Sequence, residues 1–503
     1  MEILNSLIRE NNISFLRISI VDILGEKRSI EFPASALKDI YNNLVKCDGS
    51  SLCGIGTADN SDRVICLDEN SHYFISDNTL EIFGFLQEEN EETTVFDPRE
   101  ILNKQIKILN SKGYFLNVGI EPEFYIVDEE TLDPIDDGTY FSIRQDQKST
   151  YLRKICVENL LKRNFNVSSF HHEVGPGQNE INYLFSDPMS IADTFYIYKE
   201  TIKETALKNK CIATFLPKPF KGLPGSGMHI NCSIWNFKKN NMFYDETNEH
   251  HFSDFGINFT NGILRHIKAL TALSATIDNS YLRLHSGLES PSGIFYSFND
   301  REAAIRIPSA KQSRTRIELR FVDSTAQLYL LLAGIISAGI DGLEHPLRKG
   351  EENDILPKGL LESLKYLEED EILNNYTDNV KSVVSGLDLK QYQIQALVSR
   401  AYNCGITGAL REKRGSPSRN FVDSYKAYWN DENDDLFKKD IKEADFSNKL
   451  YTEYMSQPVT SGSTYMAGLE KRRKSEWTLF QTGYYDVLRK IIHEGRRHFK
   501  CSR

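Results

Sequence analysis

The sequence has no C-x-x-C pair, although it contains eight cysteines. A zinc ribbon or a dithiol redox site uses such pairs, and a secreted disulfide scaffold is shorter and richer in cysteine. No uninterrupted apolar run approaches the ~18 residues that a membrane helix needs. Residues 1–11 include acidic residues and lack a small-residue cleavage site, so we expect no signal peptide. These absences predict a cytoplasmic protein with reduced thiols and no membrane partner.

The chain also lacks a basic tract. Its 60 Lys and Arg residues are outnumbered by 71 Asp and Glu residues, which gives a formal net charge of −11. Nucleic-acid-binding proteins neutralise phosphates with clustered basic residues, so this balance argues against a nucleic-acid partner. With 503 residues, 40% hydrophobic and 26% charged, the composition is ordinary for a globular protein of more than one domain.

Two regions of different character make up the chain. Residues 1–96 are predicted to form a small β-rich domain, because residues 13–20 alternate as a half-buried strand and residues 27–32 are typical of its return strand. Asp97 and Pro98 then supply a helix cap and a first helical residue. We therefore place a domain boundary between residues 96 and 97.

Strands alternate with helices in the larger region, 97–503. The predicted strands cover residues 115–127, 211–216 and 228–235, and the predicted helices cover residues 190–207, 259–275 and 328–343. Residues 376–450 are dominated by charged residues, Asn and Tyr, which indicates an atypical inserted segment. A long amphipathic helix is expected at residues 466–495.

Acidic side chains gather in two short segments. Glu121 and Glu123 are two residues apart on a predicted strand, so their side chains point to the same face. Residues 171–180 (HHEVGPGQNE) contain a Gly-Pro-Gly turn that folds the segment back, which allows Glu173 and Glu180 to face one centre. As a plain surface loop, this segment would hold an unusual number of polar groups that need partners.

Two further clusters share this chemistry. Gly225-Ser226-Gly227 precedes His229, and such small residues let the backbone approach a ligand closely. Arg316, Glu318 and Arg320 alternate along a strand, so they project to one face. An isolated R-x-E-x-R pattern would more simply be a surface salt-bridge ladder.

The combination favours a functional interpretation. The clusters supply five carboxylates, an imidazole and several guanidiniums, and Arg301 and Arg306 add two more cations. Carboxylates and His hold divalent metals, and Mg²⁺ or Mn²⁺ bridges phosphates. Arginines clamp phosphates and carboxylates. This set of groups suits phosphoryl transfer from a nucleotide to a carboxylate substrate.

In order and spacing, these clusters resemble the glutamine synthetase family of the long bacterial-type class. The motifs that carry the resemblance are residues 48–51, 121–124, 171–180, 214–219, 225–229, 279–284, 289–291, 296–308 and 316–320. The similarity runs from about residue 10 to 375 and returns at residues 470–489. It implies an α+β fold, in which a small β-grasp-like domain precedes a large catalytic domain with a curved antiparallel sheet flanked by helices.

The resemblance implies a role for each matching residue, with two or three Mg²⁺ or Mn²⁺ ions per site. The metal near the amino-acid substrate would be held by Glu123, Glu173 and Glu180, and the metal on the nucleotide phosphates by Glu121, His229 and Glu318. The implied ATP contacts are Ser233, Arg306 and Arg316. The implied substrate contacts are Glu123, Gly225, His229, Arg283 and Arg320. The implied catalytic residues are Asp48 and Ser51 on the ammonium side, Arg301 at the transferring phosphoryl group and Glu289 on a flap.

The implied reaction joins glutamate and ammonia at the expense of ATP. The γ-carboxylate of glutamate attacks the ATP γ-phosphate to give γ-glutamyl phosphate, and ammonia then displaces phosphate to give glutamine. Family members form stacked hexameric rings with active sites between subunits. We therefore expect a homododecamer in which Asp48 is delivered to the site of a neighbouring chain.

Several positions depart from the family pattern. Pro224 stands where an Asn that binds glutamate is usual, and Asn231 replaces a frequent His. Leu288 precedes Glu289 where an aromatic residue is usual. Asp354 stands where adenylylated members carry Tyr, so we expect no such regulation. Two alternatives therefore stay open: a ligase for an amine other than ammonia or an acid other than glutamate, and a non-catalytic structural or regulatory relative.

Overall fold

The computed structural model describes residues 1–23, 25–43, 45–52, 61–88, 97–144, 147–287, 290–346, 354–373, 460–461 and 464–465. The chain divides into two compact units, one of Met1–Asp48 with Asp62–Thr377 and one of Gly49–Ser61 with Asp378–Arg503. The two large sheets belong to the first unit. The predictions for residues 376–450 and 466–495 lie outside the described residues.

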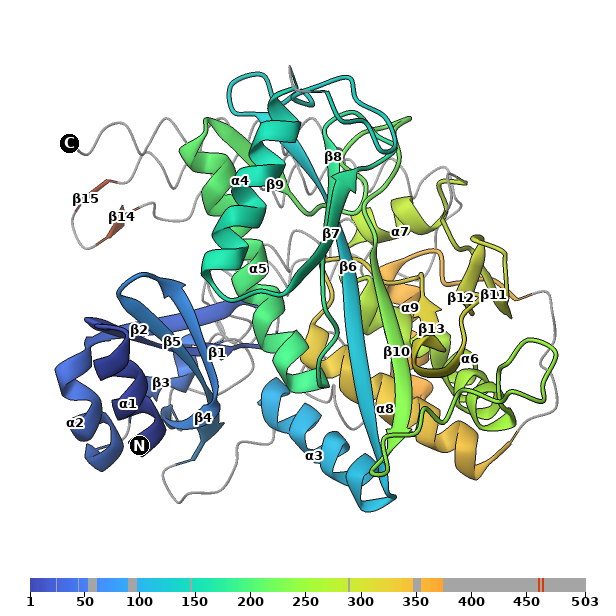
Figure 1. The fold of residues 1–503 in the computed structure, drawn as a ribbon, viewed down its shortest axis with the longest axis horizontal. Coiled ribbons are helices and arrows are strands. Elements are labelled where there is room, and N and C mark those ends of the chain that lie inside the picture. Colours follow the sequence, from blue (N-terminus) through green and yellow to red (C-terminus); the bar gives the residue numbers. More distant parts are fainter. Residues whose placement is uncertain are drawn as a thin grey trace, which may run out of the picture. The chain divides into compact units, whose positions relative to one another are not determined.

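A five-stranded sheet forms the N-terminal part of the chain (Figure 1). Its strands, in the spatial order β2-β1-β5-β4-β3, are β1 (Phe15–Val21), β2 (Lys27–Pro33), β3 (Val45–Asp48), β4 (Asp62–Ser76) and β5 (Thr79–Gln87). Helices α1 (Glu2–Glu10) and α2 (Leu37–Asn43) belong to the same region. The predicted strands near residues 13–20 and 27–32 are present, and β1 pairs in parallel with β5.

A larger sheet follows, in the order β11-β12-β13-β10-β6-β8-β7, with β9 also paired to β6. Its strands are β6 (Tyr114–Asp128), β7 (Val167–His172), β8 (Gln178–Tyr183), β9 (Cys211–Thr214), β10 (Met228–Asn236), β11 (Gly293–Ser297), β12 (Ala303–Arg306) and β13 (Ile317–Leu319). Neighbouring strands are antiparallel, except that β11 and β12 are parallel. The predicted α+β class is confirmed.

Helices accompany this sheet (Figure 1). They are α3 (Pro98–Ser111), α4 (Lys148–Lys162), α5 (Pro188–Lys208), α6 (Asp254–Ser274), α7 (Asp278–Leu284), α8 (Leu328–Glu344) and α9 (Leu360–Glu369). The predicted cap is present, because the Asp97 carboxylate accepts a hydrogen bond from the Arg99 amide at 3.0 Å. In the described part of the chain, no helix is long and apolar enough to cross a membrane.

The apolar helix α8 is buried along most of its length and packs against α6. Glycines permit this close packing. A Cβ atom added to Gly262 would lie 2.2 Å from the carbonyl oxygen of Ala338 and 2.7 Å from the Cα of Gly342. Residues 328–344 therefore form the core helix that the sequence predicted.

Candidate active site

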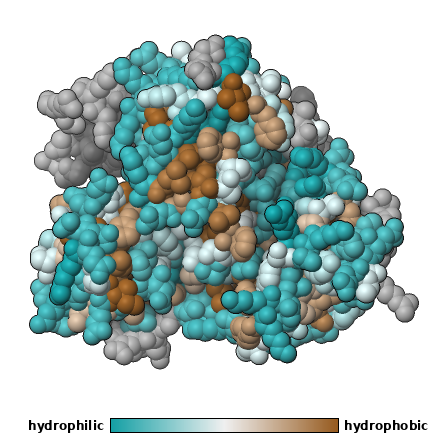
Figure 2. Space-filling view, in the orientation of Figure 1, coloured by the Kyte–Doolittle hydropathy of each residue, from teal (hydrophilic) through white to brown (hydrophobic). Residues whose placement is uncertain are grey.

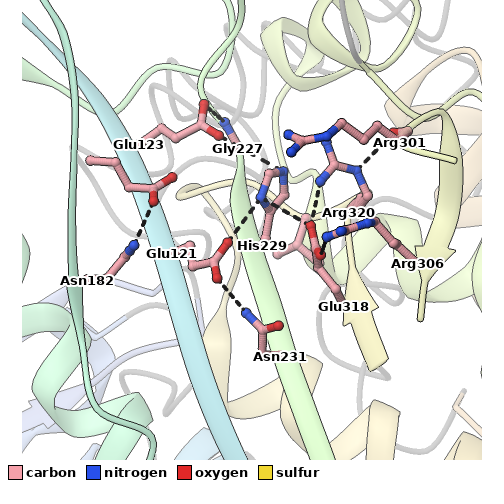
Figure 3. Close-up of polar contacts among 12 residues, drawn as sticks. Glu121, Glu123, Asn182, Gly227, His229, Asn231, Arg301, Arg306, Glu318 and Arg320 are labelled. Atoms are coloured by element: carbon pink, nitrogen blue, oxygen red, sulfur yellow. Dashed lines mark hydrogen bonds and ion pairs between the residues drawn. The ribbon is translucent and has the colours of Figure 1, made fainter. Parts of the chain in front are cut away.

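Three adjacent strands bring together one group of metal-ligand side chains. Strand β10 lies between β6 and β13, and its register places His229 opposite Glu121. The Nδ1 atom of His229 is 3.5 Å from Glu121 Oε2 and 3.7 Å from Glu318 Oε1 (Figure 3). One ligand atom from each residue lies within 4.8 Å of the others, so the three can hold a metal ion. These are the residues expected around the nucleotide phosphates.

Glu318 is buried and surrounded by cationic groups. Its carboxylate accepts hydrogen bonds from Arg306 Nη1, at 2.6 Å, and from Arg320 Nη1. Burial alone would raise the pKa of Glu318, but His229, Arg320 and Arg306 outweigh it and lower this pKa to about 2. The carboxylate is therefore ionised at neutral pH.

A second group lies at the turn end of the β7–β8 hairpin. His171 Nδ1 is 3.3 Å from Glu173 Oε1, and its Nε2 is 3.1 Å from Glu180 Oε1. These three residues also offer ligand atoms within 4.8 Å of one another. Glu123 is paired with Glu180 across β6 and β8. The expected trio of Glu123, Glu173 and Glu180 is thus neighbouring in space, and His171 joins it.

Repulsion among these carboxylates contributes to a raised pKa of Glu173. Its pKa is raised to about 8, first by burial and then by the nearby charges of Glu123 and Glu180. A divalent cation between the carboxylates would remove that repulsion, and carboxylate oxygens suit Mg²⁺ or Mn²⁺. The donor set therefore fits the metals that the family implies.

Glu123 connects the two groups. Its Oε2 accepts hydrogen bonds from the Gly227 amide at 3.0 Å and from Gln178 Nε2 at 3.1 Å, and its Oε1 is 4.0 Å from His229 Nε2. Gln178 also donates to the Gly225 carbonyl oxygen at 3.0 Å. The sequence analysis did not select Gln178, although its place in the 171–180 segment was a usable signal.

The glycines near residue 226 pack closely against a buried arginine. A Cβ atom added to Gly227 would lie 2.6 Å from Arg283 Nη2, and one added to Gly225 would lie 2.8 Å from Arg283 Cγ. Arg283 is only 3% exposed, and it donates to the carbonyl oxygens of Val322 and Arg320. The small residues thus make room for this arginine, and the close approach of a ligand to this backbone stays a prediction.

Residues expected near the nucleotide line the same strands. Asn231 donates to Glu121 Oε1 at 2.9 Å and accepts from Arg316 Nε at 2.7 Å, so it joins the first metal-ligand group to that arginine. The Ser233 hydroxyl accepts from Trp235 Nε1 at 2.9 Å. Arg301 is exposed, and its carbonyl oxygen accepts from Arg320 Nε at 2.9 Å (Figure 3).

The expected ammonium-side residues lie at the end of β3 and in the short turn that follows it in the chain. Asp48 ends β3 opposite Asp62, and Ser51 ends a short 3₁₀ turn (Gly49–Ser51); both side chains are exposed. Their delivery to a neighbouring chain stays a prediction. Glu289 and Leu288 lie outside the described residues.

Two aromatic residues that the sequence analysis did not select stand beside the second group. The exposed rings of Tyr140 and Phe141 are stacked with centroids 4.0 Å apart. Both rings meet His171 edge-on, at centroid distances of 5.8 Å and 4.9 Å. Phe141 has a backbone φ of +62°, which is uncommon for a bulky residue and often marks a functional site.

Known proteins of one family are similar to this chain. The family model described as "Glutamine synthetase, catalytic domain" matches residues 95–396. Glutamine synthetase of Pyrococcus furiosus is 33% identical over 385 residues, which cover 72% of this chain and 87% of that protein. Glutamine synthetase of Methanococcus voltae is 33% identical over 435 residues, covering 80% and 96%.

Solved structures show the same fold. A structure titled "GmaS/ADP complex-Conformation 1" has a TM-score of 0.68 and 26% identity, and the match covers 79% of this chain and 99% of that one. A cryo-EM structure of Plasmodium falciparum glutamine synthetase has a TM-score of 0.71 at 24% identity, covering 80% and 96%. Fold and site together define an ATP-dependent carboxylate–amine ligase. The chain belongs to the glutamine synthetase family.

Proposed function

We propose that the protein forms glutamine from glutamate and ammonia through γ-glutamyl phosphate, with ATP as the phosphoryl donor. The observation that carries this proposal is the position of His229 between two acidic groups. Its Nδ1 faces Glu121 and Glu318, whereas its Nε2 faces Glu123 of the second group. Two adjacent cation sites suit a reaction that must hold the triphosphate and the attacking carboxylate side by side.

Each group has a distinct task in this proposal. Glu121, His229 and Glu318 hold the cation on the nucleotide phosphates, and Glu123, Glu173 and Glu180 hold the cation near the amino acid. Bound Mg²⁺ or Mn²⁺, two or three ions per site, supplies neutralisation of phosphate charge. His171 lies between the second-group carboxylates, so its ring either becomes a ligand or turns away when the site fills.

The arginines orient and neutralise the two substrates. Arg306 and Arg316 hold the nucleotide phosphates, Ser233 lies on the adenine side, and Arg301 neutralises the transferring phosphoryl group. The hydrogen bonds that Arg306 and Arg320 donate to Glu318 support this assignment. Arg283, Arg320 and Gly225 position the glutamate carboxylates.

The acceptor side is completed by a neighbouring chain. Asp48 and Ser51 attract the ammonium ion and take its proton, and Glu289 closes a flap over the site. Closure excludes water, which would otherwise hydrolyse the acyl phosphate. The assembly is a cytoplasmic homo-oligomer of stacked hexameric rings.

The second candidate function uses an organic amine in place of ammonia. Two observations favour it: Pro224 cannot supply the side-chain contact of the usual Asn, and the exposed Tyr140–Phe141 pair adds apolar surface beside the second group. Asp48 and the small polar residues after it favour ammonia, which is why glutamine formation is our first proposal.

An assay of phosphate release with different acids and amines distinguishes these functions. Purified protein with ATP and Mg²⁺ is incubated with glutamate and ammonia, then with other acids and a panel of primary amines. We expect the highest rate with glutamate and ammonia. A higher rate with an organic amine would replace our proposal by the second candidate. No release with any pair, together with a melting temperature that ATP and Mg²⁺ do not shift, would indicate a non-catalytic relative.

A further inference from the structure

We propose that His172 and Asp136 form a buried hydrogen-bonded pair that positions Glu173 for cation binding. Neither residue has an assigned role, and neither belongs to the two acidic groups described above. The purpose of the pair rests on the proposed function, because that function makes Glu173 a cation ligand. The pair itself is defined by the hydrogen bonds below.

Both nitrogens of the His172 ring are engaged. The ring is 0% exposed; its Nδ1 lies 2.6 Å from the Glu173 carbonyl oxygen, and its Nε2 lies 3.0 Å from Asp136 Oδ1. A carbonyl and a carboxylate can only accept hydrogen bonds. Both ring nitrogens thus face acceptors, and the His172 ring links the Glu173 backbone to the Asp136 carboxylate.

Asp136 ties this ring to two separate backbone segments. Its Oδ1 also accepts from the amides of Gly138, at 3.0 Å, and Gly177, at 2.8 Å. Gly138 belongs to the loop after β6, and Gly177 belongs to the turn between β7 and β8. One carboxylate thus holds the loop, the hairpin turn and the histidine together.

The backbone around the pair leaves no room for larger residues. A Cβ atom on Gly138 would lie 2.3 Å from His172 Nε2. Gly177 has a φ of +69°, and a Cβ atom there would lie 2.8 Å from the Ile126 carbonyl oxygen. Both glycines are therefore required if the His172 ring and the turn are to reach Asp136.

These contacts hold the backbone of Glu173 in place. Its carbonyl oxygen is held by His172, and its amide donates to the Gln178 carbonyl oxygen at 2.9 Å. With the backbone fixed on both sides, the Glu173 carboxylate is kept close to His171 and Glu180. His172 acts through Glu173, so it is a positioning residue. Residues that orient metal ligands typically change metal affinity about 10–100-fold when they are replaced.

Titration with Mn²⁺, followed by electron paramagnetic resonance, tests this role in the full-length protein. We expect His172→Gln and Asp136→Asn each to weaken the Mn²⁺ affinity of the site formed by Glu123, Glu173 and Glu180 about 10–100-fold. The class formed by Glu121, His229 and Glu318 should keep its affinity. Asp137→Asn is the matched control, because Asp137 is adjacent in sequence and its side chain is 83% exposed.

Hydrogen exchange gives a second readout without metal. The Gly177 and Gly138 amides should exchange faster in Asp136→Asn, which removes a charged acceptor and tolerates folding better than the histidine variant. Unchanged Mn²⁺ affinities, or equal weakening of both site classes, would overturn the proposal. The wild-type protein could bind Mn²⁺ at two classes of site and still release no phosphate with any acceptor. The proposed reaction would then fail, and the Mn²⁺ affinities of the variants would still decide the positioning role.

Discussion

His229 is the residue at which the two acidic groups of the site meet. Strand alternation points its ring to the same face as Glu121, and pairing with β13 brings Glu318 to the other side. The imidazole therefore contacts carboxylates through both nitrogens, at distances of 3.5 to 4.0 Å. These contacts are longer than hydrogen bonds, which leaves space for a cation between the ligand atoms.

Replacement of Glu318 tests the first group. Glu318→Gln removes one charged ligand and leaves Arg306 and Arg320 without their carboxylate. We expect kcat for phosphate release to fall by more than about 100-fold, because even residues behind metal ligands cost about 10–100-fold. Glu302→Gln is the control, since Glu302 is exposed. Near-normal activity in Glu318→Gln would remove this residue from the site.

Gly227 tests the packing beneath Glu123. In Gly227→Ala the new Cβ would lie 2.6 Å from Arg283 Nη2 and 3.3 Å from His229 Nε2. The displaced amide would no longer hold Glu123, so we expect kcat/KM to fall about 100-fold, as for small misplacements of catalytic groups. Gly119→Ala on β6 is the control, because its nearest contact would be 3.4 Å. Equal kinetics in both variants would contradict this packing role.

At this scale, the structure brings together several side chains that the sequence grouped, but the sequence did not indicate all of their neighbours. Glu121, His229 and Glu318 were grouped by resemblance, and the strand register brings them together. His171 was missed because two adjacent histidines point to opposite faces of a strand, and sequence does not tell which one faces the carboxylates. Gln178 was missed because its hydrogen bonds join segments that only the folded hairpin brings together.

Among the elements, α3, α5, α8 and β4 share a buried polar connection. Asp193 on α5 is fully buried and accepts hydrogen bonds from Arg99 on α3, at 3.1 Å and 3.0 Å. It also accepts from the hydroxyls of Tyr329 on α8 and Ser71 on β4. The pKa of Arg99 is raised, since Asp193 and its other partners outweigh the burial that would lower it.

Removal of this carboxylate should destabilise the first unit. Asp193→Ala leaves the Arg99 guanidinium buried and without its main partner, which typically costs about 3–5 kcal/mol. Urea unfolding measures the change, with the exposed Asp77→Ala as the control. A change below about 1 kcal/mol, the size expected of an exposed pair, would show that the connection is not structural.

A second connection joins α6 to α8 and to the end of α9. His266 Nδ1 is 2.6 Å from Asp370 Oδ2, and its Nε2 is 3.0 Å from Asp341 Oδ2. Arg265 and His345 also face Asp341. Burial lowers the pKa of His266, but the hydrogen bonds and charges of the two aspartates outweigh it and raise the pKa above 6.5.

The contacts of His266 with the two aspartates make the stability of the fold depend on pH, with a sign that follows from its raised pKa. A histidine whose pKa is raised by folding stabilises the folded state fully at pH values below its unfolded pKa of about 6.5. This stabilisation is lost as the pH rises through its folded-state pKa. We expect His266→Gln to lose about 1.5–3 kcal/mol at pH 6, the usual range for hydrogen bonds to charged groups, and less at pH 9. Urea unfolding at both pH values measures it, with exposed His250→Gln as control. A larger loss at pH 9 would reverse the sign and contradict the assignment.

Elements with a clear period were predicted well, and they include the strands near residues 115–127 and 228–235. The helices near residues 190–207, 259–275 and 328–343 are present with shifts of a few residues at their ends. Strand β4 was missed because its polar sequence becomes a strand only through pairing with β3 and β5. The boundary at residues 96 and 97 stays a prediction.

For the whole molecule, the exposed apolar surface of the described residues leads us to expect an oligomer. Figure 2 shows hydrophobic surface near the middle of one face, over the region where Figure 1 shows α4 and α5. Leu161, Phe170, Leu184 and Phe185 are all more than 40% exposed, and Phe170 lies on β7, which ends the large sheet. Exposed apolar patches and open sheet edges are typical of interaction sites. We therefore expect light scattering to give the mass of a large oligomer, and a monomeric mass would contradict this.

Subunit mixing tests whether the site is shared between chains. Asp48→Ala removes a proposed site residue from the small sheet, and Glu318→Gln removes one from the large sheet. Each variant alone should therefore be nearly inactive in glutamine formation. Asp48→Ala should retain more phosphorylation of glutamate than ammonia capture, because the carboxylate acts only in the second step. In mixed head-to-tail rings, a chain with intact Glu318 meets a neighbour with intact Asp48 at about a quarter of the sites.

Activity near that fraction after co-expression would show that two chains build one site. If both residues served the same chain, no mixed oligomer could contain an intact site, and the mixture would stay as inactive as its parents. The mixing ratio supplies the control, because activity should pass through a maximum at equal amounts and fall toward either parent. A mixture whose activity only averages those of the two parents would place Asp48 and Glu318 in the site of one chain, or Asp48 outside the site altogether.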